Sequence, residues 1–423
     1  MLKNKGIYIS LLLLTGVLSV KAQSTINSPY TRYGLGDLIV PTSTNNAGFG
    51  GVGYALRTSD QVNVMNPASY TSVDSLAFMF DIGLSLRTSN FTENGIKANA
   101  RNSTFDYVNM QFRLHKRLGM AIGFIPYSNS GYNFSETKTI PNSGLTQISN
   151  TFTGEGGLQQ IFAGLGFKIM DNLSIGVNFG YLYGKLEYGT TAVLSKGGDS
   201  RITYDNIEVR SYKFDAGLQY TQPFNEKNRL TLGLTYSLGH KLNSTEVAGD
   251  KITNGSNYTD ERKKEYQDVY GIPHTYAGGL MYQYSNKLKI GIDYAFEQWS
   301  KTSYNQDIAK YAYRNRQRMA GGIEYSPNPM SRKYLSRVFY RLGTNVQDSY
   351  LVMPNGANGP KEYSVSFGFG FPISVSQRNS VFSITGQYTR VKPEMKDMLS
   401  ENRFMIKLGL TFNERWFMKF KVN

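Results

Sequence analysis

The chain has 423 residues, with 46 Lys and Arg against 31 Asp and Glu, and it is rich in Tyr (31), Phe (24) and Gly (43). Its long apolar run, Ile7 to Val20, is too short to cross a bilayer as a helix, which argues against a helical membrane protein. The absence of Cys excludes disulfides, thiolate metal sites and a lipid-modified N-terminal cysteine.

The first 22 residues have the form of a secretory signal peptide. Lys3 and Lys5 precede the apolar run, and Val20-Lys21-Ala22 follows it, so cleavage is predicted between Ala22 and Gln23. A secreted, Tyr-rich chain without a basic cluster on a helix does not suit a nucleic-acid binder. The excess of basic residues is assigned to lipid and lipopolysaccharide phosphates, or to a lumen that takes an anionic ligand.

Residues 23–73 lack strand periodicity and are dense in Gly, Asn and Ser. Gly48, Gly50, Gly51 and Gly53 resemble a phosphate-binding loop, but the strand before it and the helix after it are missing, which argues against a nucleotide site. Glycine also permits close packing and unusual dihedral angles. Because irregular backbone at membrane depth must be surrounded by protein or water, this segment is predicted to be a periplasmic or lumenal plug, or hatch.

Residues 74–423 are predicted to form an all-β, transmembrane antiparallel β-barrel of about 14 strands. In the stretch from Arg229 to His240, Leu and Tyr side chains alternate with Thr, Gly and Ser, so that one face is apolar and the other is small and polar. This pattern recurs along the chain. The predicted strands lie near 76–86, 108–114, 118–134, 152–169, 173–183, 212–220, 230–238, 274–284, 288–296, 313–325, 338–342, 363–371, 382–388 and 404–412.

The connections between these strands alternate between long and short. Residues 90–101, 135–150, 189–202 and 241–270 are long, whereas 115–118, 170–172, 222–228 and 285–287 are short, with 326–333 a long member of the short class. Bacterial outer-membrane barrels have long outer loops and short periplasmic turns, so the termini are predicted to face the periplasm of a Gram-negative cell. Pro126 falls inside a strand and predicts a bulge.

Two motifs resemble the FadL/TodX family of outer-membrane transporters for hydrophobic compounds. The Gly/Ala-rich run from Ala47 to Ala55 is followed by Asn66-Pro67-Ala68 just before the first strand, as in that family. The ending from Ile406 to Phe417 and the V-K-A-Q cleavage region resemble Bacteroidota members. The resemblance implies a plugged channel for small hydrophobic or amphipathic molecules, gated by the plug residues Gly48, Gly50, Gly51, Gly53, Asn66, Pro67 and Ala68.

Two features differ from the FadL/TodX pattern and leave a second function open. A leader from Ser28 to Leu38 precedes the Gly-rich run, and the chain ends in Lys421-Val422-Asn423 rather than in an aromatic residue. The alternative is a non-transporting barrel subunit of a larger outer-membrane complex, such as protein assembly or secretion machinery. In that case the leader would serve as a docking element.

The most specific candidate site is a group of arginines on two neighbouring strands, here called the basic wall. With apolar side chains facing lipid, Arg314, Arg316 and Arg318 point inward from one strand, and Arg337 and Arg341 from the next. Such a wall suits the carboxylate or phosphate head of an amphipathic ligand. The alternatives are contact with lipopolysaccharide, or a ladder of ion pairs in which Asp293 and Glu297 of the preceding strand lie near Arg318 and Arg314.

The remaining features do not indicate an enzyme. His240 and His274 flank the longest loop, but no nucleophile or further metal ligand has the required spacing, so catalysis, metals and cofactors are not expected. The mixed charge run from Asp260 to Glu265 in that loop is interpreted as a solvated surface or as a partner-binding epitope.

Overall fold

The computed structural model describes residues 26–75, 77–141, 146–195, 197, 199–254, 257–302, 312–375, 378–395 and 398–415. The predicted signal peptide (1–22) and the C-terminal residues Lys421, Val422 and Asn423 lie outside the described residues. Among the described residues, no helix is long and apolar enough to cross a membrane.

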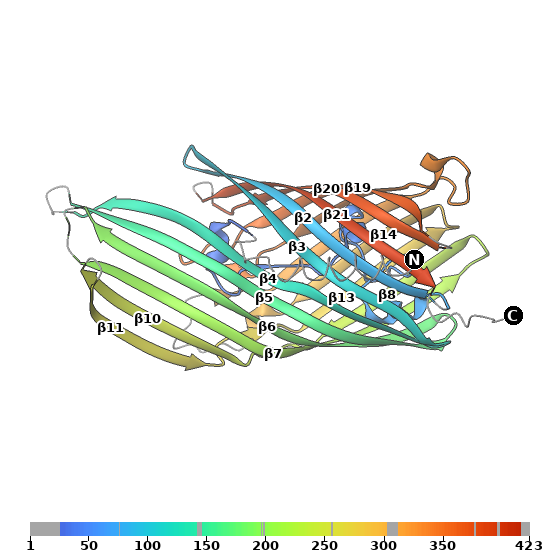
Figure 1. The fold of residues 1–423 in the computed structure, drawn as a ribbon, viewed down its shortest axis with the longest axis horizontal. Coiled ribbons are helices and arrows are strands. Elements are labelled where there is room, and N and C mark those ends of the chain that lie inside the picture. The colour runs from blue at the N-terminus through green and yellow to red at the C-terminus, as the bar shows by residue number, and fades with distance from the viewer. Residues whose placement is uncertain are drawn as a thin grey trace, which may run out of the picture.

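The architecture is a closed antiparallel barrel of 14 strands (Figure 1). Each strand pairs with the next along the chain, and the last pairs with the first through sixteen residues from Ala77↔Arg415 to Thr92↔Ser400, which closes the wall. The barrel strands are β2 (Ala77–Glu93), β3 (Ile96–His115), β4 (Leu118–Thr139), β5 (Gln147–Met170), β6 (Leu173–Leu194), β7 (Ser200–Pro223), β8 (Asn228–Ser237), β13 (Thr275–Tyr284), β14 (Leu288–Glu297), β16 (Arg316–Tyr325), β17 (Phe339–Gln347), β19 (Lys361–Val375), β20 (Arg378–Lys392) and β21 (Ser400–Arg415).

The remaining elements lie in the lumen and in the connections. Those before the barrel are η1 (Pro29–Arg32), β1 (Asp37–Leu38), α2 (Thr44–Gly48) and η2 (Pro67–Ser72). Those between barrel strands are β9 (His240–Lys241), β10 (Ser244–Asn254), β11 (Asn257–Gln267), β12 (Gly271–Ile272), η3 (Trp299–Lys301), β15 (Ala312–Tyr313), η4 (Tyr334–Arg337) and β18 (Leu351–Val352).

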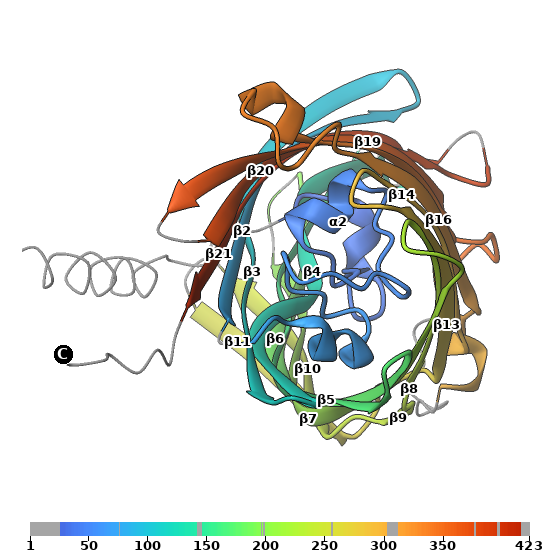
Figure 2. The same ribbon diagram turned by 90° about the vertical axis from the view of Figure 1, so that its right-hand side faces the viewer.

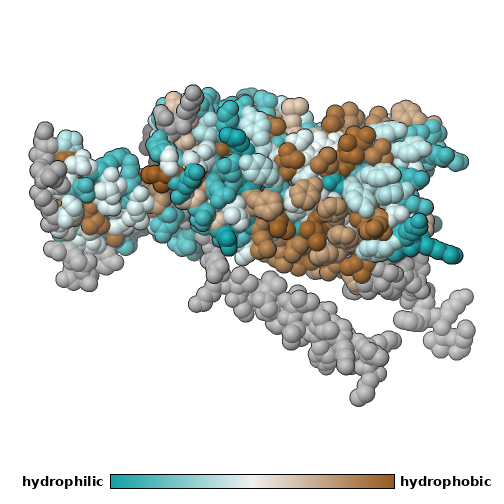
Figure 3. Space-filling view, turned by 90° about the horizontal axis from the view of Figure 1, so that it is seen from above, coloured by the Kyte–Doolittle hydropathy of each residue, from teal (hydrophilic) through white to brown (hydrophobic). Residues whose placement is uncertain are grey.

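The alternation of side chains sorts the strands into a lipid face and a lumenal face, as predicted. In β8, Leu232 and Leu234 are exposed on the outside, whereas Thr231 is buried. Equivalent exposed Leu, Ile, Val, Phe and Tyr side chains on the other strands form an apolar belt around the barrel, nearer to one end (Figure 3). That distribution is what lipid requires of a barrel exterior.

Strands extend into all four predicted long loops named above, and two of these loops are almost entirely regular sheet. β2 and β3 continue through the predicted loop 90–101 to a tight turn at Asn94 and Gly95, which have positive φ of 47° and 82°. Within 241–270, β10 pairs with residues 200–209 at the start of β7, and β11 pairs with β10 (Figure 1). Cross-strand ion pairs such as Arg201–Asp250 and Lys251–Glu261 support this sheet beyond the apolar belt, so it needs no apolar face and has no apolar signature in the sequence.

The wall has a seam between β3 and β4. The predicted bulge is present, because the β4–β5 register shifts between Pro126 and Ser128. β3 and β4 pair from His115↔Leu118 to Val108↔Phe124 and diverge beyond that pair, towards the end of the long connections (Figure 1). β1 pairs there with β4, through Asp37↔Asn129 and Leu38↔Ser128, so the chain's own N-terminal part covers the free edge of β4.

Residues 26–75, here called the N-terminal segment, run through the interior of the barrel (Figure 2). They start beside Glu401, at the end of the long connections, and end at the short-turn end, where β2 begins. The backbone of the segment lies against inward glycines of the wall: an added Cβ at Gly343 would be 2.0 Å from Gly50 N, and one at Gly233 would be 2.0 Å from Tyr54 O. Other glycines that lie against the backbone of the segment are Gly119, Gly166, Gly176, Gly322 and Gly368, whereas Gly217, Gly291 and Gly409 lie against its side chains.

This packing gives a stability prediction. The Gly343→Ala substitution should lower the free energy of unfolding by about 1–3 kcal/mol, because the new methyl group meets backbone atoms that cannot rotate away. Gly321→Ala on the same hairpin is the matched control, since its Cβ would meet nothing nearer than 3.9 Å. Comparing the temperatures at which the folded bands disappear in semi-native electrophoresis tests this; equal temperatures for the two variants would contradict the close packing.

Candidate functional site

The lumen is the candidate site, and three of the five predicted wall arginines face it. Arg316 and Arg318 on β16 and Arg341 on β17 are buried inside the barrel. Arg314 and Arg337 differ from the prediction. Arg314 precedes β16, so the strand alternation no longer applies to it, and Arg337 ends η4 in the β16–β17 connection, where its guanidinium lies 5.2 Å from the centre of the Tyr334 ring.

The three inward arginines have partners within the chain. Arg316 pairs with Glu297 at 2.8 Å, and Arg341 pairs with Glu324 at 2.6 Å. Glu324 also accepts a hydrogen bond from Lys289 at 2.8 Å, which makes a three-membered cluster. Arg318 donates to the carbonyl of Gly51 at 2.8 Å, so it holds the N-terminal segment.

The acidic residues of β14 match the predicted ladder only in part, since Asp293 lies close enough to Arg318 to interact electrostatically. In the β14–β16 register, Glu297 lies opposite Arg316 and not beside Arg314. Asp293 accepts hydrogen bonds from the backbone N–H groups of Gly53 at 2.7 Å and Tyr54 at 3.0 Å. The carboxylate of Asp293 and the guanidinium of Arg318 therefore bind opposite backbone groups of the same glycine-rich turn.

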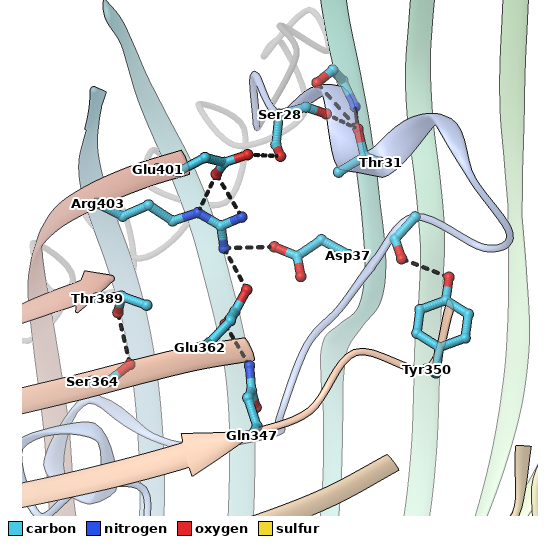
Figure 4. Close-up of polar contacts among 12 residues, drawn as sticks. Ser28, Thr31, Asp37, Gln347, Tyr350, Glu362, Ser364, Thr389, Glu401 and Arg403 are labelled. Atoms are coloured by element: carbon cyan, nitrogen blue, oxygen red, sulfur yellow. Dashed lines mark hydrogen bonds and ion pairs between the residues drawn. The ribbon is translucent and has the colours of Figure 1, made fainter. Parts of the chain in front are cut away.

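A second buried charge cluster was not predicted (Figure 4). Arg403 on β21 lies 2.8 Å from Glu401, 3.0 Å from Glu362 on β19 and 3.4 Å from Asp37 on β1. Ser28 donates a hydrogen bond to Glu401. This cluster ties the first described part of the N-terminal segment to the strands that close the barrel. The alternation of Glu401 and Arg403 on one face was its only sequence signal.

The predicted plug residues fix the shape of the N-terminal segment. Gly50 and Gly51 have positive φ of 76° and 80°, which glycine adopts at no steric cost. Asn66 caps η2 by accepting a hydrogen bond from Ala68 N at 3.1 Å and donates to Tyr54 O at 2.8 Å, while Pro67 begins the turn. Gly48 packs on Gly368, and Gly53 packs against Met65.

An apolar cluster fills the lumen at the end of the long connections. Trp299 and Tyr350 lie with ring centres 4.5 Å apart, and the Tyr350 hydroxyl donates to Gly36 O at 2.8 Å. Leu35 from the N-terminal segment is fully buried among them. The other buried members of this cluster are Leu38, Leu158, Leu182, Leu186, Ile207, Val209, Leu242, Ile272, Leu351, Met353 and Ala357.

The lumenal space that remains beside the basic wall is small. One cavity of about 130 Å³ lies between Arg316, Arg318, Tyr54, Phe162 and Ile125, and a second of about 130 Å³ is lined by Arg318, Arg87 and Arg403. Small-molecule sites usually have roughly 300–1,000 Å³. Each of these two cavities is therefore smaller than a typical small-molecule site.

The two loop histidines are engaged by tyrosines. The ring of His240 stacks on Tyr212 with centres 4.0 Å apart, and His274 Nδ1 lies 2.8 Å from the Tyr236 hydroxyl. Within the described ranges, no group of three or more His, Asp or Glu side chains is placed to hold a metal ion.

Comparisons with solved structures identify the fold. The CymD monoaromatic hydrocarbon channel matches with a TM-score of 0.60 and 14% identity over 89% of this chain and 98% of its own. A Pseudomonas aeruginosa FadL homologue gives 0.61 and 14%, covering 88% and 98%. The Pseudomonas putida toluene transporter TodX gives 0.59 and 14%, covering 92% and 100%. The chain therefore has the FadL/TodX-type outer-membrane barrel fold, as its motifs indicated.

Sequence comparisons place the chain more narrowly. No curated protein matches the sequence. A family model described as BamG matches residues 1–423, the whole length of the chain. With this match across the barrel, the N-terminal segment and both ends, the protein belongs to the BamG family.

Proposed function

We propose that this protein is a non-transporting barrel subunit of a larger outer-membrane complex, of the kind that assembles or secretes other proteins. The observation that carries the proposal is the way the N-terminal segment is built into the lumen. Its backbone lies on the glycines of the wall, and its turns are held by Asp293 and Arg318. The segment acts here as a permanent plug, and the barrel as a closed scaffold.

The electrostatics of the lumen support a closed scaffold. A site for an anionic ligand needs arginines that are free to bind it, whereas Arg316, Arg341 and Arg403 already have carboxylate partners. A ligand would have to displace a buried carboxylate and leave it without compensation, which is strongly unfavourable. The basic wall is therefore proposed to hold the barrel and the segment together.

Location follows from the barrel type. We place the short turns and the C-terminal end of β21 in the periplasm, and the long connections with the β10–β11 hairpin outside the cell, where they contact lipopolysaccharide and partner subunits. The Bacteroidota origin suggested by the C-terminal motif belongs to the same proposal.

The second candidate function is a channel for small hydrophobic molecules, favoured by the seam. Leu38 and Ile39 of the N-terminal segment and Ile125 of β4 form the apolar part of the cavity behind it, so displacement of β1 would join this cavity to the outside of the wall. The solved relatives with this fold include channels named for toluene and monoaromatic hydrocarbons.

Extraction of the native protein in mild detergent distinguishes the two functions. We expect it to run in a complex with other envelope proteins in fixed stoichiometry and to carry no bound hydrophobic molecule, as judged by size and by mass spectrometry of proteins and lipids. The matched control is an unrelated, abundant barrel from the same membranes. A monodisperse single barrel that carries fatty-acid-like molecules would overturn the scaffold proposal.

The cluster around Arg403 tests whether the plug is fixed. Arg403→Met leaves Glu401, Glu362 and Asp37 buried without their cation and should cost about 3–5 kcal/mol of stability. Arg201→Met breaks the exposed pair with Asp250 and should leave the stability nearly unchanged, because water screens exposed charges. Thermal unfolding measures both costs, and limited proteolysis reports release of the N-terminal segment. An Arg403→Met barrel as stable and as protease-resistant as the Arg201→Met barrel would contradict a fixed plug.

The channel function has its own test. In the otherwise cysteine-free chain, Leu38→Cys with Ser128→Cys places two cysteines on directly paired positions across the seam. If the seam conducts, oxidation should reduce uptake of a labelled aromatic hydrocarbon at least tenfold, and a reductant should restore it. Either single-cysteine variant is the control. Uptake that does not differ from cells lacking the protein, in both redox states, would remove the channel function.

A further inference from the structure

The β16–β17 connection stands apart from the other turns at the short-turn end. It spans residues 326–338, whereas neighbouring connections span only 116–117, 171–172, 224–227 and 285–287. Neither the closure of the barrel nor the packing of the N-terminal segment requires the extra length, because β16 and β17 are already paired up to Tyr325↔Tyr340. We call residues 326–338 the interfacial loop.

The interfacial loop exposes large apolar side chains. Met330 is 91% exposed, Leu335 69% and Tyr334 43%. The loop also carries Arg332, Lys333 and Arg337 and contains no acidic residue. Exposed apolar side chains flanked by basic residues, without acidic ones, are typical of segments that bind an anionic membrane surface.

The loop is held in its conformation by hydrogen bonds of its own. Asn328 N donates to Ser336 O at 2.8 Å, and Ser326 N donates to Lys287 O at 2.7 Å in the adjacent turn. The Tyr340 hydroxyl donates to Leu335 O at 3.1 Å, which joins the loop to β17. The exposure of the apolar side chains is therefore imposed by a fixed backbone and does not come from an unfolded turn.

The position of the interfacial loop indicates which partner it contacts. Tyr325 and Tyr340 form the last pair of the β16–β17 ladder before the loop. Tyr325 is 47% exposed on the lipid side, as in the aromatic rows that mark the headgroup level of barrels. Seen from the short-turn end, the loop with η4 lies outside the outline of the wall and not across its mouth (Figure 2). A segment at this height and on this side faces the surface of the bilayer.

We propose that the interfacial loop docks on anionic phospholipid headgroups of the leaflet at the short-turn end. Met330, Tyr334 and Leu335 enter the region between headgroups and acyl chains, and Arg332 and Lys333 pair with phosphates. The docking fixes the height and tilt of the barrel in that leaflet. It does not depend on whether the barrel is a scaffold or a channel.

The test uses the absence of native cysteine, which makes a single label unique. Leu335→Cys carrying the fluorophore NBD is reconstituted as the full barrel in phosphatidylcholine vesicles, with or without phosphatidylglycerol. Lys116→Cys in the β3–β4 turn, also exposed, is the matched control. We expect a blue shift of the NBD emission and quenching by lipid-borne nitroxide for the label at Leu335 only. Both effects should be stronger with phosphatidylglycerol. In the double variant Arg332→Gln/Lys333→Gln, this additional effect of phosphatidylglycerol should be lost.

Three outcomes would overturn the proposal. The Leu335 label could match the Lys116 label in both vesicle types, which would place the loop in water. It could be immersed equally with and without phosphatidylglycerol, which would remove the anionic requirement. It could be exposed in vesicles and shielded only in the native complex, which would assign the loop to a protein partner. Semi-native electrophoresis of each labelled variant confirms that the barrel is folded.

Discussion

The structure depends on backbone packed against backbone. An irregular segment inside a barrel has N–H and C=O groups that must find partners or water, and it must also fit within the wall. The wall meets both needs with glycines that let the segment approach and with Asp293 and Arg318, which bind the N–H groups of Gly53 and Tyr54 and the carbonyl of Gly51. The Gly positions that alternate with Leu in strands such as β8 are therefore sites of contact with the N-terminal segment.

The buried charges define where that segment sits more than they add stability. A buried ion pair gains little over an apolar replacement, but removing one partner is costly, so each cluster permits one arrangement and penalises the others. Arg403 holds Asp37 of β1 beside Glu362 and Glu401, and Ser28 reaches the same Glu401. The start of the segment is thereby tied to β19 and β21. Its middle is tied to β14 and β16 by Asp293 and Arg318.

Much of the barrel could be predicted, because lipid imposes a period-two pattern that is local in sequence. The lipid face of β8 and the bulge at Pro126 follow from single stretches. The β10–β11 sheet could not be predicted, because it is stabilised by cross-strand charges such as Lys251–Glu261 and lacks an apolar face. The prediction that Arg337 points inward from a strand was wrong, because β17 begins only at Phe339. The Arg403 cluster joins positions 37, 362, 401 and 403, which meet only through barrel closure and β1 pairing.

The seam shows why a shared fold does not transfer a function. A bulged strand beside a diverging neighbour leaves a free edge, and a free edge can open a path through the wall or bind another strand. Here the edge of β4 is occupied by the same chain: Ser28 N donates to Gly131 O at 2.8 Å and Ile39 N to Tyr127 O at 2.9 Å, on either side of β1. Opening the seam would break these bonds and also separate Asp37 from Arg403. Because these contacts would be lost together, opening the seam carries a cost that new contacts would have to offset.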